Sequence, residues 1–356
     1  MEKLKVAIIG QGRSGRNIHG FYFRSEENQH YQVVAVVDRD EARRKLALEE
    51  YPGCVTFENY QDLYGMDLDL VINSTFSELH YPITKDLLEQ DLPVLVEKPM
   101  ARNYEEAADL IRIAKERNVF LGVFQQSFLM PYYQKLKETI ASGKLGRITQ
   151  VNIAYSDFER RWDWQTQLSH MGGCVYNKGP HAIGFGLDLM DFSEDAQVVY
   201  SKLDRVLTSG DAEDVAKIIL AAPGKPVVDI EINNNDAFCG YKLKVLGSRG
   251  TYKTGVHHYD MKYIVDGENP EQPEICEPLT NAEGLPSYCT EKLIIHEESG
   301  DFEGDASQIA TGRFYEMVYG HLAEGKPMAV TAANIAKLID VIEVIHEQNP
   351  EFMAKW

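Results

Sequence analysis

Short apolar runs alternate with amphipathic stretches over the first 123 residues of the chain. The apolar runs are typical of buried strands and fall at Leu4–Ile9, Val33–Val37, Leu68–Ile72, Val94–Val96 and Val119–Val123. The stretches between them carry the 3.6-residue period of helices, at Arg13–Ser25, Asp40–Glu50, Leu79–Gln90 and Tyr104–Arg117. Strands and helices that alternate in this way predict a doubly wound parallel sheet in an α/β domain.

The pattern changes after residue 123. Helical periodicity is predicted at Tyr132–Ser142, near His181–Met190, and late in the chain at Gln308–Leu322 and Ala332–Glu347. Strands are predicted at Arg147–Asp157, Val198–Leu203, Val215–Ala221, Val227–Ile232 and Tyr241–Leu246, with Gly, Pro and Asn between the later ones. This order favours an α+β domain with an open, mainly antiparallel sheet. We therefore predict domains at 1–123 and 124–330, and a C-terminal helix within 331–356 that packs back on the body.

Charge and composition limit the classes of partner that we expect the protein to bind. The formal net charge of the 356 residues is −19, and a field of this sign repels phosphate backbones and anionic lipid. We expect no nucleic-acid or membrane partner, and with no long apolar run and no signal peptide we expect a cytoplasmic protein. The five cysteines form no CxxC pair, so we expect neither disulfides nor a zinc site. His257-His258 is expected in a turn that binds no metal, and Glu297–Glu303 in a solvated acidic loop.

A glycine-rich turn follows the first predicted strand. Gly10-Gln11-Gly12-Arg13-Ser14-Gly15 has the spacing GxGxxG and opens a predicted helix. In this setting the first two glycines permit a tight turn and the close approach of a pyrophosphate, and the third allows the helix to pack on the strand. The motif predicts a dinucleotide-binding Rossmann domain in which Gly10, Gly12, Arg13, Ser14 and Gly15 contact the cofactor.

An acidic residue, Asp38, ends the second predicted strand. A carboxylate at this position accepts hydrogen bonds from the adenosine ribose and repels a 2′-phosphate, which favours NAD. Arg39 follows directly and is able to stack on adenine or meet a phosphate, so NADP stays open as the alternative.

The predicted strand Val94–Val96 runs into Glu97-Lys98-Pro99. Lys98 thus stands at the carboxyl end of a parallel strand, the edge at which open α/β sheets bind their ligands. Partial desolvation there lowers the pKa of a lysine, so Lys98 is a candidate to exchange a proton with a substrate hydroxyl.

With these motifs the chain resembles the Gfo/Idh/MocA family, the group of glucose-fructose oxidoreductase and inositol dehydrogenase, over nearly its full length. The segments that carry the resemblance are Ile8–Gly15, Ser74–His80, Val94–Pro99, Ser142–Gly146 and Gly172–His181. The resemblance implies a Rossmann domain, then a domain whose sheet face forms subunit contacts, hence a homodimer or homotetramer. It implies that Lys98 approaches the reacting hydroxyl and that the peptide bond before Pro99 is cis. It also adds Ser74, Thr75, His80, Glu97 and Lys98 to the cofactor-binding residues.

Gly172–His181 is similar to the family pattern GGxxxDxGxHxxD but keeps only part of it. His181 matches the family histidine, Asn177 stands in place of the aspartate, and Gly184 replaces the final acid. We interpret His181 as the general acid/base, Lys98 as the group that polarises the oxygen, and Asn177 as a substrate-orienting residue that cannot accept a proton.

A basic and aromatic segment precedes the glycine pair of this motif. It contains Arg160, Arg161, Trp162 and Trp164, and aromatic faces with arginine forks suit a sugar. Packing of the tryptophans between domains and pairing of the arginines with nearby acids is the open alternative. We list all four with Asn177 and His181 as candidate substrate-binding residues.

The predicted function is hydride transfer between NAD, or alternatively NADP, and a hydroxyl-bearing carbon of a sugar, sugar derivative or cyclitol. Two alternatives stay open. One is a redox-neutral epimerase or lyase with tightly bound NAD, which Asn177 makes more credible. The other is a non-catalytic dinucleotide-binding sensor, against which the retention of Lys98 and His181 argues.

Overall fold

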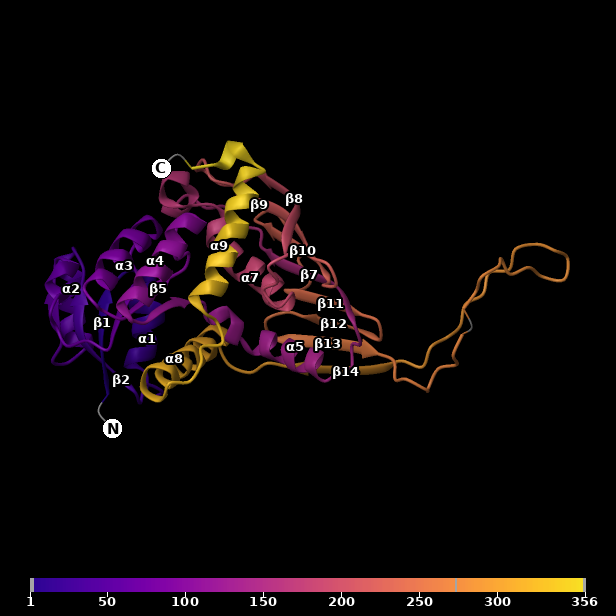
Figure 1. Cartoon of the computed structure of the whole chain (residues 1–356), viewed down its shortest axis with the longest axis horizontal. Helices are drawn as coiled ribbons and strands as arrows, with labels where there is room; N and C mark the ends of the chain where they lie inside the picture. Colours follow the sequence, from indigo (N-terminus) through magenta and orange to yellow (C-terminus); the bar gives the residue numbers. More distant parts are fainter. Residues whose placement is uncertain (1–2, 273, 355–356) are drawn as a thin grey trace.

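The computed structural model describes residues 3–272 and 274–354, which form two sheets with helices around and between them (Figure 1). The first sheet is parallel throughout and has the strand order β3-β2-β1-β4-β5-β6. Its strands are β1 (Leu4–Ile9), β2 (Tyr31–Val37), β3 (Val55–Phe57), β4 (Leu70–Asn73), β5 (Val94–Glu97) and β6 (Leu121–Phe124). This is the doubly wound α/β sheet that the alternating pattern predicts.

The helices of this half follow the predicted ranges closely, except after the glycine turn. They are α1 (Gly20–Arg24), α2 (Glu41–Glu50), α3 (His80–Glu89) and α4 (Tyr104–Arg117). The predicted helix Arg13–Ser25 contains a π-helical turn, η1 (Gly15–His19), before α1. Such turns are rare and are found frequently at functional sites. At the start of α4 the Asn103 side chain accepts a hydrogen bond of 2.9 Å from the Glu106 amide, a normal N-cap.

The second sheet has eight strands in the order β14-β13-β12-β11-β7-β10-β9-β8. All neighbours are antiparallel except β7 and β10, which are parallel. The strands are β7 (Ile148–Ser156), β8 (Gln197–Asp204), β9 (Val215–Ala221), β10 (Val227–Asn233), β11 (Leu243–Gly247), β12 (Gly250–Thr254), β13 (His258–Tyr263) and β14 (His296–Asp301). The mainly antiparallel α+β domain is confirmed.

One face of the second sheet is covered and the other is open. The helices of this half are α5 (Pro131–Ala141), α6 (Cys174–Asn177) and α7 (Gly179–Leu189). Together with α9 (Ala332–Glu347) they lie on one side of the sheet, and no helix covers the opposite face (Figure 1). Buried and half-buried positions alternate along β9 and β10, as expected for a sheet with one buried face.

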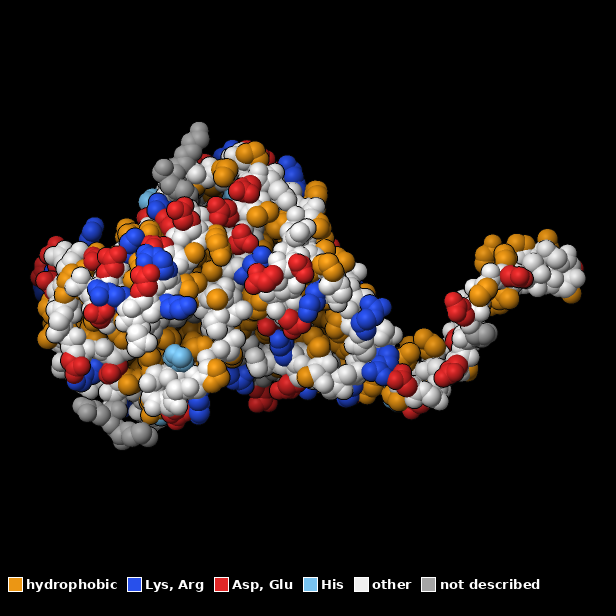
Figure 2. Space-filling model, viewed as in Figure 1, with side chains coloured by type: hydrophobic (Ala, Val, Ile, Leu, Met, Phe, Trp, Pro, Cys, Tyr) orange, Lys and Arg blue, Asp and Glu red, His pale blue; other side chains and the backbone are white. Residues whose placement is uncertain are grey.

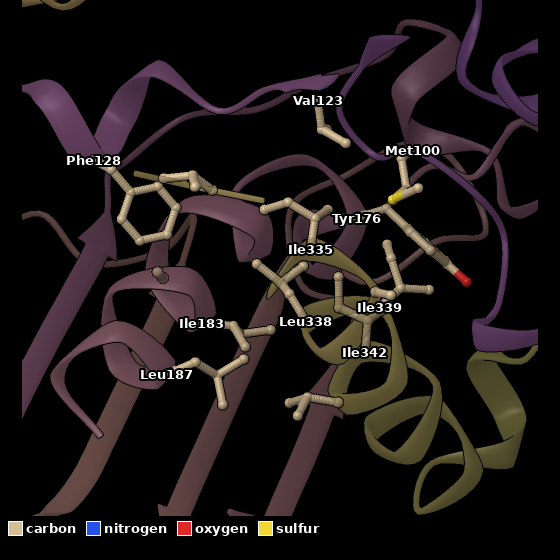
Figure 3. Close-up of a cluster of buried hydrophobic side chains, with 14 of the residues drawn as sticks. Met100, Val123, Phe128, Tyr176, Ile183, Leu187, Ile335, Leu338, Ile339 and Ile342 are labelled. Atoms are coloured by element: carbon tan, nitrogen blue, oxygen red, sulfur yellow. The ribbon is translucent and has the colours of Figure 1, made fainter. Parts of the chain in front are cut away.

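The two late helices pack in different places. Ile335, Leu338 and Ile342 of α9 meet Ile183 and Leu187 of α7 in the core between the sheets (Figure 3). In contrast, α8 (Ala306–Glu324) packs on the first domain, where its Phe314, Tyr315 and Val318 join the cluster under β1 and β2. The Tyr31 hydroxyl donates a hydrogen bond of 2.7 Å to the carbonyl of Tyr315. The late segment 306–324 therefore completes the core of the first domain, although we predicted domain 124–330 to contain it.

Three features differ from the secondary structure expected. β3 and the strands β12 to β14 have no strong apolar run and were not predicted. The expected acidic loop Glu297–Glu303 is mostly strand β14, which pairs in register with β13, and His258 begins β13 rather than lying in a turn. β3 and β14 are edge strands without a buried residue, so they carry little hydrophobic signal. β12 and β13 bury only isolated positions, at Tyr252, Thr254 and Met261, which are too few to form an apolar run.

Other structural observations bear on the predicted partners. None of the helices within 3–272 and 274–354 is both long and apolar enough to cross a membrane. All five cysteines are free, and no cluster of three or more metal-ligating side chains occurs in the described part of the chain.

Candidate active site

A large cavity lies between the two domains. Its volume is about 1670 Å³, which exceeds the usual size of a small-molecule site and leaves room for a dinucleotide together with a substrate. The lining residues come from the carboxyl ends of the strands of the first sheet and from α6, α7 and β7 of the second domain. We call the part near the glycine turn the cofactor end and the part near His181 the substrate end.

The glycine turn forms the wall of the cofactor end. Gly10 has φ +91°, and a Cβ there would lie 2.8 Å from the Ser74 carbonyl oxygen. A Cβ at Gly15 would meet the Gly10 carbonyl oxygen at 1.8 Å, so Gly15 serves packing and does not line the cavity. A Cβ at Gly12 would meet no atom within 4 Å, because Gly12 faces open space in the cavity. Gly10 thus permits the tight turn, Gly15 permits close packing against it, and the open space at Gly12 fits a pyrophosphate. These are the roles that the motif predicts.

Buried polar groups of the turn also fit a bound cofactor. Both amide atoms of the Gln11 side chain are buried and have no hydrogen-bond partner within the described chain. Buried polar atoms are normally paired, so these atoms indicate a ligand that brings polar groups into the turn. Exposed Arg13 and half-buried Ser14 line the same wall.

Asp38 lies beside this turn at the end of β2. One oxygen of its carboxylate accepts a hydrogen bond of 2.7 Å from the Gln11 amide, and the other accepts one of 2.8 Å from the Asp40 amide. Arg39 and Arg43 also line the cavity, and a guanidinium nitrogen of Arg43 lies 3.5 Å from the Asp38 carboxylate. The residues expected to distinguish NAD from NADP therefore lie together here. They are one carboxylate, Asp38, and two arginines, Arg39 and Arg43.

The remaining predicted cofactor residues also lie at this end. Ser74 and Thr75 follow β4 and line the cavity, and the Ser74 hydroxyl donates a hydrogen bond of 2.8 Å to the Ile9 carbonyl. His80 is buried, its Nδ1 lies 2.7 Å from the Pro99 carbonyl oxygen, and its burial lowers its pKa. His80 therefore supports the segment that follows β5.

Glu97 is the centre of a buried polar network. Its carboxylate pairs with the His19 Nε2 at 3.1 Å and accepts a hydrogen bond from the Ser14 hydroxyl. Burial alone raises the pKa of this carboxyl, but the hydrogen bond and charge of His19 and the hydrogen bond of Ser14 outweigh it and lower the pKa to about 2. Glu97 is thus a fully ionised buried carboxylate that ties the glycine turn to Lys98.

Lys98 projects from this network toward the second domain. Its Nζ donates a hydrogen bond of 2.8 Å to the Asn177 carbonyl oxygen and lies 3.4 Å from the Asn177 side-chain oxygen. Burial lowers the pKa of Lys98, Glu97 opposes the shift, and the charges of Arg13 and Arg161 add to it. The bond between Lys98 and Pro99 is cis, as the resemblance implies. Residues 98 and 177 meet as predicted, but Asn177 contacts Lys98 chiefly through its backbone.

His181 lines the same end from the first turn of α7. Its ring stacks on that of Tyr155 with 5.9 Å between the centres, and its Nδ1 is buried without a partner in the described chain. Burial and the nearby charge of Lys98 lower the pKa of His181 to about 3. The imidazole is therefore neutral near pH 7 and is able to accept a proton.

The basic and aromatic segment divides into two pairs. Arg161 and Trp164 line the cavity, and the Trp164 ring meets the Phe76 ring edge to face at 5.1 Å across the domain boundary. Arg160 and Trp162 are exposed and do not line the cavity. Arg161 is bound by Asp163 at 2.7 Å, so the alternative in which an arginine pairs with a nearby acid describes it well.

Sequence reasoning missed several residues at the substrate end. Tyr132, Tyr155 and Lys242 line it, the two tyrosine hydroxyls lie 3.2 Å apart, and the Lys242 Nζ is 5.0 Å from the Tyr155 ring centre. These residues come from α5, β7 and the start of β11, which share no motif. Only the strand pairing brings them together.

Comparison with known proteins agrees with this site. The family model described as "Oxidoreductase family, NAD-binding Rossmann fold" matches residues 4–125, and the model of the GFO/IDH/MocA C-terminal domain matches residues 133–253. The scyllo-inositol 2-dehydrogenase (NADP(+)) IolW of Bacillus subtilis is 24% identical over 99% of this chain and 95% of its own length.

Solved structures of similar fold cover nearly the whole chain. The putative oxidoreductase yvaA from Bacillus subtilis has a TM-score of 0.80 at 18% identity and covers 98% of this chain and 96% of its own. GenD2 from gentamicin A biosynthesis, crystallised with NAD, has a TM-score of 0.77 at 18% identity and covers 98% of this chain and 95% of its own. The chain therefore belongs to the Gfo/Idh/MocA family and is an NAD-binding oxidoreductase.

Proposed function

We propose that the protein transfers a hydride between NAD and a hydroxyl-bearing carbon of a sugar, sugar derivative or cyclitol. The observation that carries the proposal is the meeting of Lys98 and His181 in one cavity with the glycine turn. The inositol dehydrogenase among the relatives supports a polyhydroxylated substrate. NAD bound at the cofactor end supplies the acceptor for the hydride, and its reduced form supplies the donor.

The side chains at the substrate end have complementary roles in this reaction. Lys98 uses one ammonium hydrogen to bind the Asn177 carbonyl oxygen, which leaves two hydrogens for the substrate oxygen. A donor held in this way stabilises the negative charge that develops on that oxygen as its proton departs. Lys98 thus orients the hydroxyl and polarises the carbonyl in the reverse direction.

Neutral His181 receives the hydroxyl proton during oxidation and returns it during reduction. In the resting site the positive charge of Lys98 disfavours a protonated imidazole, and this charge contributes to the low pKa of His181. Negative charge that develops on the substrate oxygen offsets Lys98, so His181 becomes a stronger base as the reaction proceeds. Tyr155 holds the imidazole ring in place by stacking.

The proposal is tested with Lys98→Met and His181→Ala on a panel of sugars and cyclitols. Each variant is expected to lose about 10²- to 10⁴-fold in turnover, the usual contribution of a positioned acid or base. NAD affinity, measured by calorimetry, is expected to change little, since neither side chain is part of the glycine turn. Lys326→Met, at an exposed lysine paired with Glu324, is the matched control.

Near-normal turnover in either variant would refute its role. Release of NADH on addition of a sugar supports net oxidation. Formation of a new sugar without net NADH would instead show a redox-neutral epimerase or lyase, and NAD binding without turnover of any substrate would favour a sensor.

A further inference from the structure

One lysine at the substrate end stands apart from the other cations there. Lys242 is half-buried, lines the cavity, and has its Nζ 5.0 Å from the centre of the Tyr155 ring. Among the described residues, no carboxylate forms an ion pair or a hydrogen bond with it. A cation without a counterion is conspicuous inside a cleft of a chain whose net charge is −19.

The neighbouring cations already have partners. Arg161 is bound by both oxygens of Asp163, with the closest contact at 2.7 Å. Lys178 donates to Asp157 at 2.9 Å and to the Asn234 side chain at 2.7 Å. Charge that is neutralised within the protein adds little to the binding of an anion. Lys98 also forms no ion pair among the described residues, but its Nζ donates to the Asn177 carbonyl oxygen and the proposed function assigns its remaining hydrogens to the reacting oxygen. Lys242 is therefore the candidate for a separate anionic group.

Lys242 and the acid/base residue both contact Tyr155. The Lys242 Nζ is 5.0 Å from the centre of the Tyr155 ring, and the His181 ring stacks on the same ring with 5.9 Å between the centres. Both residues line the cavity, so one bound sugar is able to reach both. Sugars suit such a surface, because their C–H faces pack on aromatic rings.

We propose that Lys242 binds an anionic group of the substrate, a carboxylate or a phosphate carried by the sugar. The assignment rests on the proposed function and names its substrate class as acidic sugars. Lys242 is a specificity-determining residue in this view, and it takes no part in hydride or proton transfer.

The test compares glucose, glucuronate and glucose 6-phosphate, which differ only in the group at one end. With NAD present, at least one anionic sugar is expected to exceed glucose by about tenfold or more in kcat/KM, and the anion that gains identifies carboxylate or phosphate. Lys242→Met is expected to remove this advantage and to leave glucose nearly unchanged, and Lys326→Met is expected to keep it.

Binding is measured in parallel by thermal shift of the NAD-saturated protein with the same three sugars. If none of the sugars is turned over, a shift by an anionic sugar that Lys242→Met abolishes still supports the subsite, although the proposed function then fails. Equal loss on neutral and anionic sugars, or no preference for either anion in turnover and binding, would overturn the proposal.

A second, independent feature is the long connection between β13 and β14. Residues 264–272 and 274–295, which we call the arm, leave the body as an extended segment (Figure 1), and hydrophobic side chains gather near its tip (Figure 2). Tyr288 is 96% exposed and Ile275 61%, and Leu279, Leu285 and Ile294 are exposed as well. None of the described residues of the arm belongs to a hydrophobic core cluster of the chain.

The hydrogen bonds along the arm join residues of the arm to one another. Ser287 donates from its amide to the Leu279 carbonyl at 2.9 Å, and the Ile294 amide donates to the Asn269 side chain at 2.7 Å. Beyond its base, where Asp266 meets Arg249 and Glu268 meets His296, no hydrogen bond joins the described residues of the arm to the body. Two paired segments of this kind are marginally stable in water alone, so the arm requires a surface to pack on.

The position of the arm indicates which surface this is. The arm projects on the side of the open sheet face, opposite α7 and α9 (Figure 1). Sheets pack face to face about 10 Å apart, whereas an extended segment such as 264–281 spans up to roughly 60 Å. A body seated on the open face therefore lies well within the reach of the arm.

Exposed apolar side chains lie on this same face. Tyr200 of β8 and Val227 of β10 are 52% and 45% exposed. Lys217 of β9 is paired with Asp229 and Glu231 of β10, so its charge is neutralised within the face. Each copy of the chain thus carries an arm and a sheet face that both expose apolar side chains.

We infer that the arm clasps a second copy of this chain seated on the open sheet face. A two-fold arrangement buries two faces and two arms in one contact, which explains why the apolar arm is exposed in a single chain. The arm is thus a specific structural element of the homo-oligomer that we expect to form through the C-terminal sheet.

The test measures mass by sedimentation over a range of concentrations. A chain in which a short Gly-Ser turn replaces residues 267–293 is expected to associate at least about tenfold more weakly than the full chain, with unchanged circular dichroism. Tyr288→Ser is expected to weaken association in the same direction, and Tyr104→Ser, at an exposed tyrosine of the first domain, is its matched control. A monomeric full chain at micromolar concentration, or equal association without the arm, would overturn the inference.

Discussion

The two ends of the cavity are built in different ways. The cofactor end is formed largely by one short segment, in which the turn from Gly10 to Gly15 contacts Asp38 at the end of the neighbouring strand. The substrate end is assembled from Lys98 of the first domain, Asn177 and His181 after a long connection, and Tyr155 of β7. A local motif therefore forms most of the predicted cofactor site, whereas strand pairing and domain packing bring together the residues that we propose for the chemistry.

The difference also appears in the two buried glutamates. Glu97 is ionised because His19 and Ser14 satisfy its carboxylate. Glu213 lies behind α6, accepts a hydrogen bond of 2.9 Å from the Val175 amide, and has one oxygen without a partner in the described chain. Burial raises the pKa of Glu213 to about 8. Glu213 does not line the cavity. The same residue type is thus charged beside the cavity and neutral behind it, because only Glu97 has partners that favour its charged form strongly enough to offset burial.

The largest effect is expected from glycine substitutions at the cofactor end. Gly15→Ala places a Cβ 1.8 Å from the Gly10 carbonyl oxygen and is expected to weaken NAD binding about 100-fold or more and to lower the melting temperature. Gly12→Ala meets no protein atom and is expected to weaken NAD binding about tenfold at unchanged stability. Calorimetry and thermal melts separate the two. Equal behaviour of the two variants would contradict the division of roles among the glycines.

The stability of the fold is expected to depend on pH through Glu213. The unfolded chain releases this proton near pH 4.5, whereas the folded protein retains it up to about pH 8. The contribution to stability is therefore full below pH 4.5 and falls as the pH rises toward 8. Glu213→Gln is expected to reduce the loss of unfolding free energy between pH 5 and 8 by about 2 to 3 kcal/mol, measured by urea denaturation. Parallel pH profiles of the two proteins would show that Glu213 is ionised when folded.

Cofactor choice is expected to change with Asp38→Ala. Removal of the carboxylate leaves Arg39 and Arg43 at the ribose end, so the ratio of NADP to NAD affinity is expected to rise about 10- to 30-fold. Asp38 also accepts a hydrogen bond from the Gln11 amide, so the substitution is expected to lower the affinity for both cofactors to some extent. Titration with both dinucleotides measures the ratio of the two affinities. An unchanged ratio would show that the 2′-phosphate of NADP does not bind near Asp38.

The smallest effect is expected from Asn177→Ala. Its backbone carbonyl binds Lys98 at 2.8 Å, whereas its side-chain oxygen is 3.4 Å away, so the loss of the amide is expected to lower kcat only about 3- to 5-fold. Steady-state kinetics with the NAD-saturated enzyme measure it. A loss as large as that of Lys98→Met would assign the side chain a direct role in catalysis.

The residues predicted from the sequence to bind the cofactor lie close together in the fold, although their contacts with NAD stay predictions. GxGxxG, Asp38 and Lys98 lie at strand ends, and the carboxyl edge of a parallel sheet brings strand ends together. The fold class and the NAD cofactor are confirmed. The predicted site roles of Lys98, His181 and Asn177 stay predictions, although the cavity holds all three.

The substrate end could be predicted only in part. Tyr155 of β7 and Lys242, which directly precedes β11, come together because these two strands pair, and register between strands far apart in sequence leaves no local pattern. Arg160 and Trp162 show the opposite error, since the composition of their segment suits a sugar but their side chains are exposed. The polar strands β13 and β14 escaped prediction because they are rich in charged residues and bury only one side chain, Met261 of β13.

The placement of α8 has a consequence for how the chain is made. Tyr315 of α8 is fully buried against Tyr22 and Tyr31, so the first sheet lacks part of its core until residue 324 has been synthesised. During translation the N-terminal domain is therefore expected to stay partly unfolded until the ribosome has added the second domain and α8. A fragment that ends near residue 125 would expose this aromatic pocket and aggregate, so the cofactor domain is a unit of structure without being a unit of sequence.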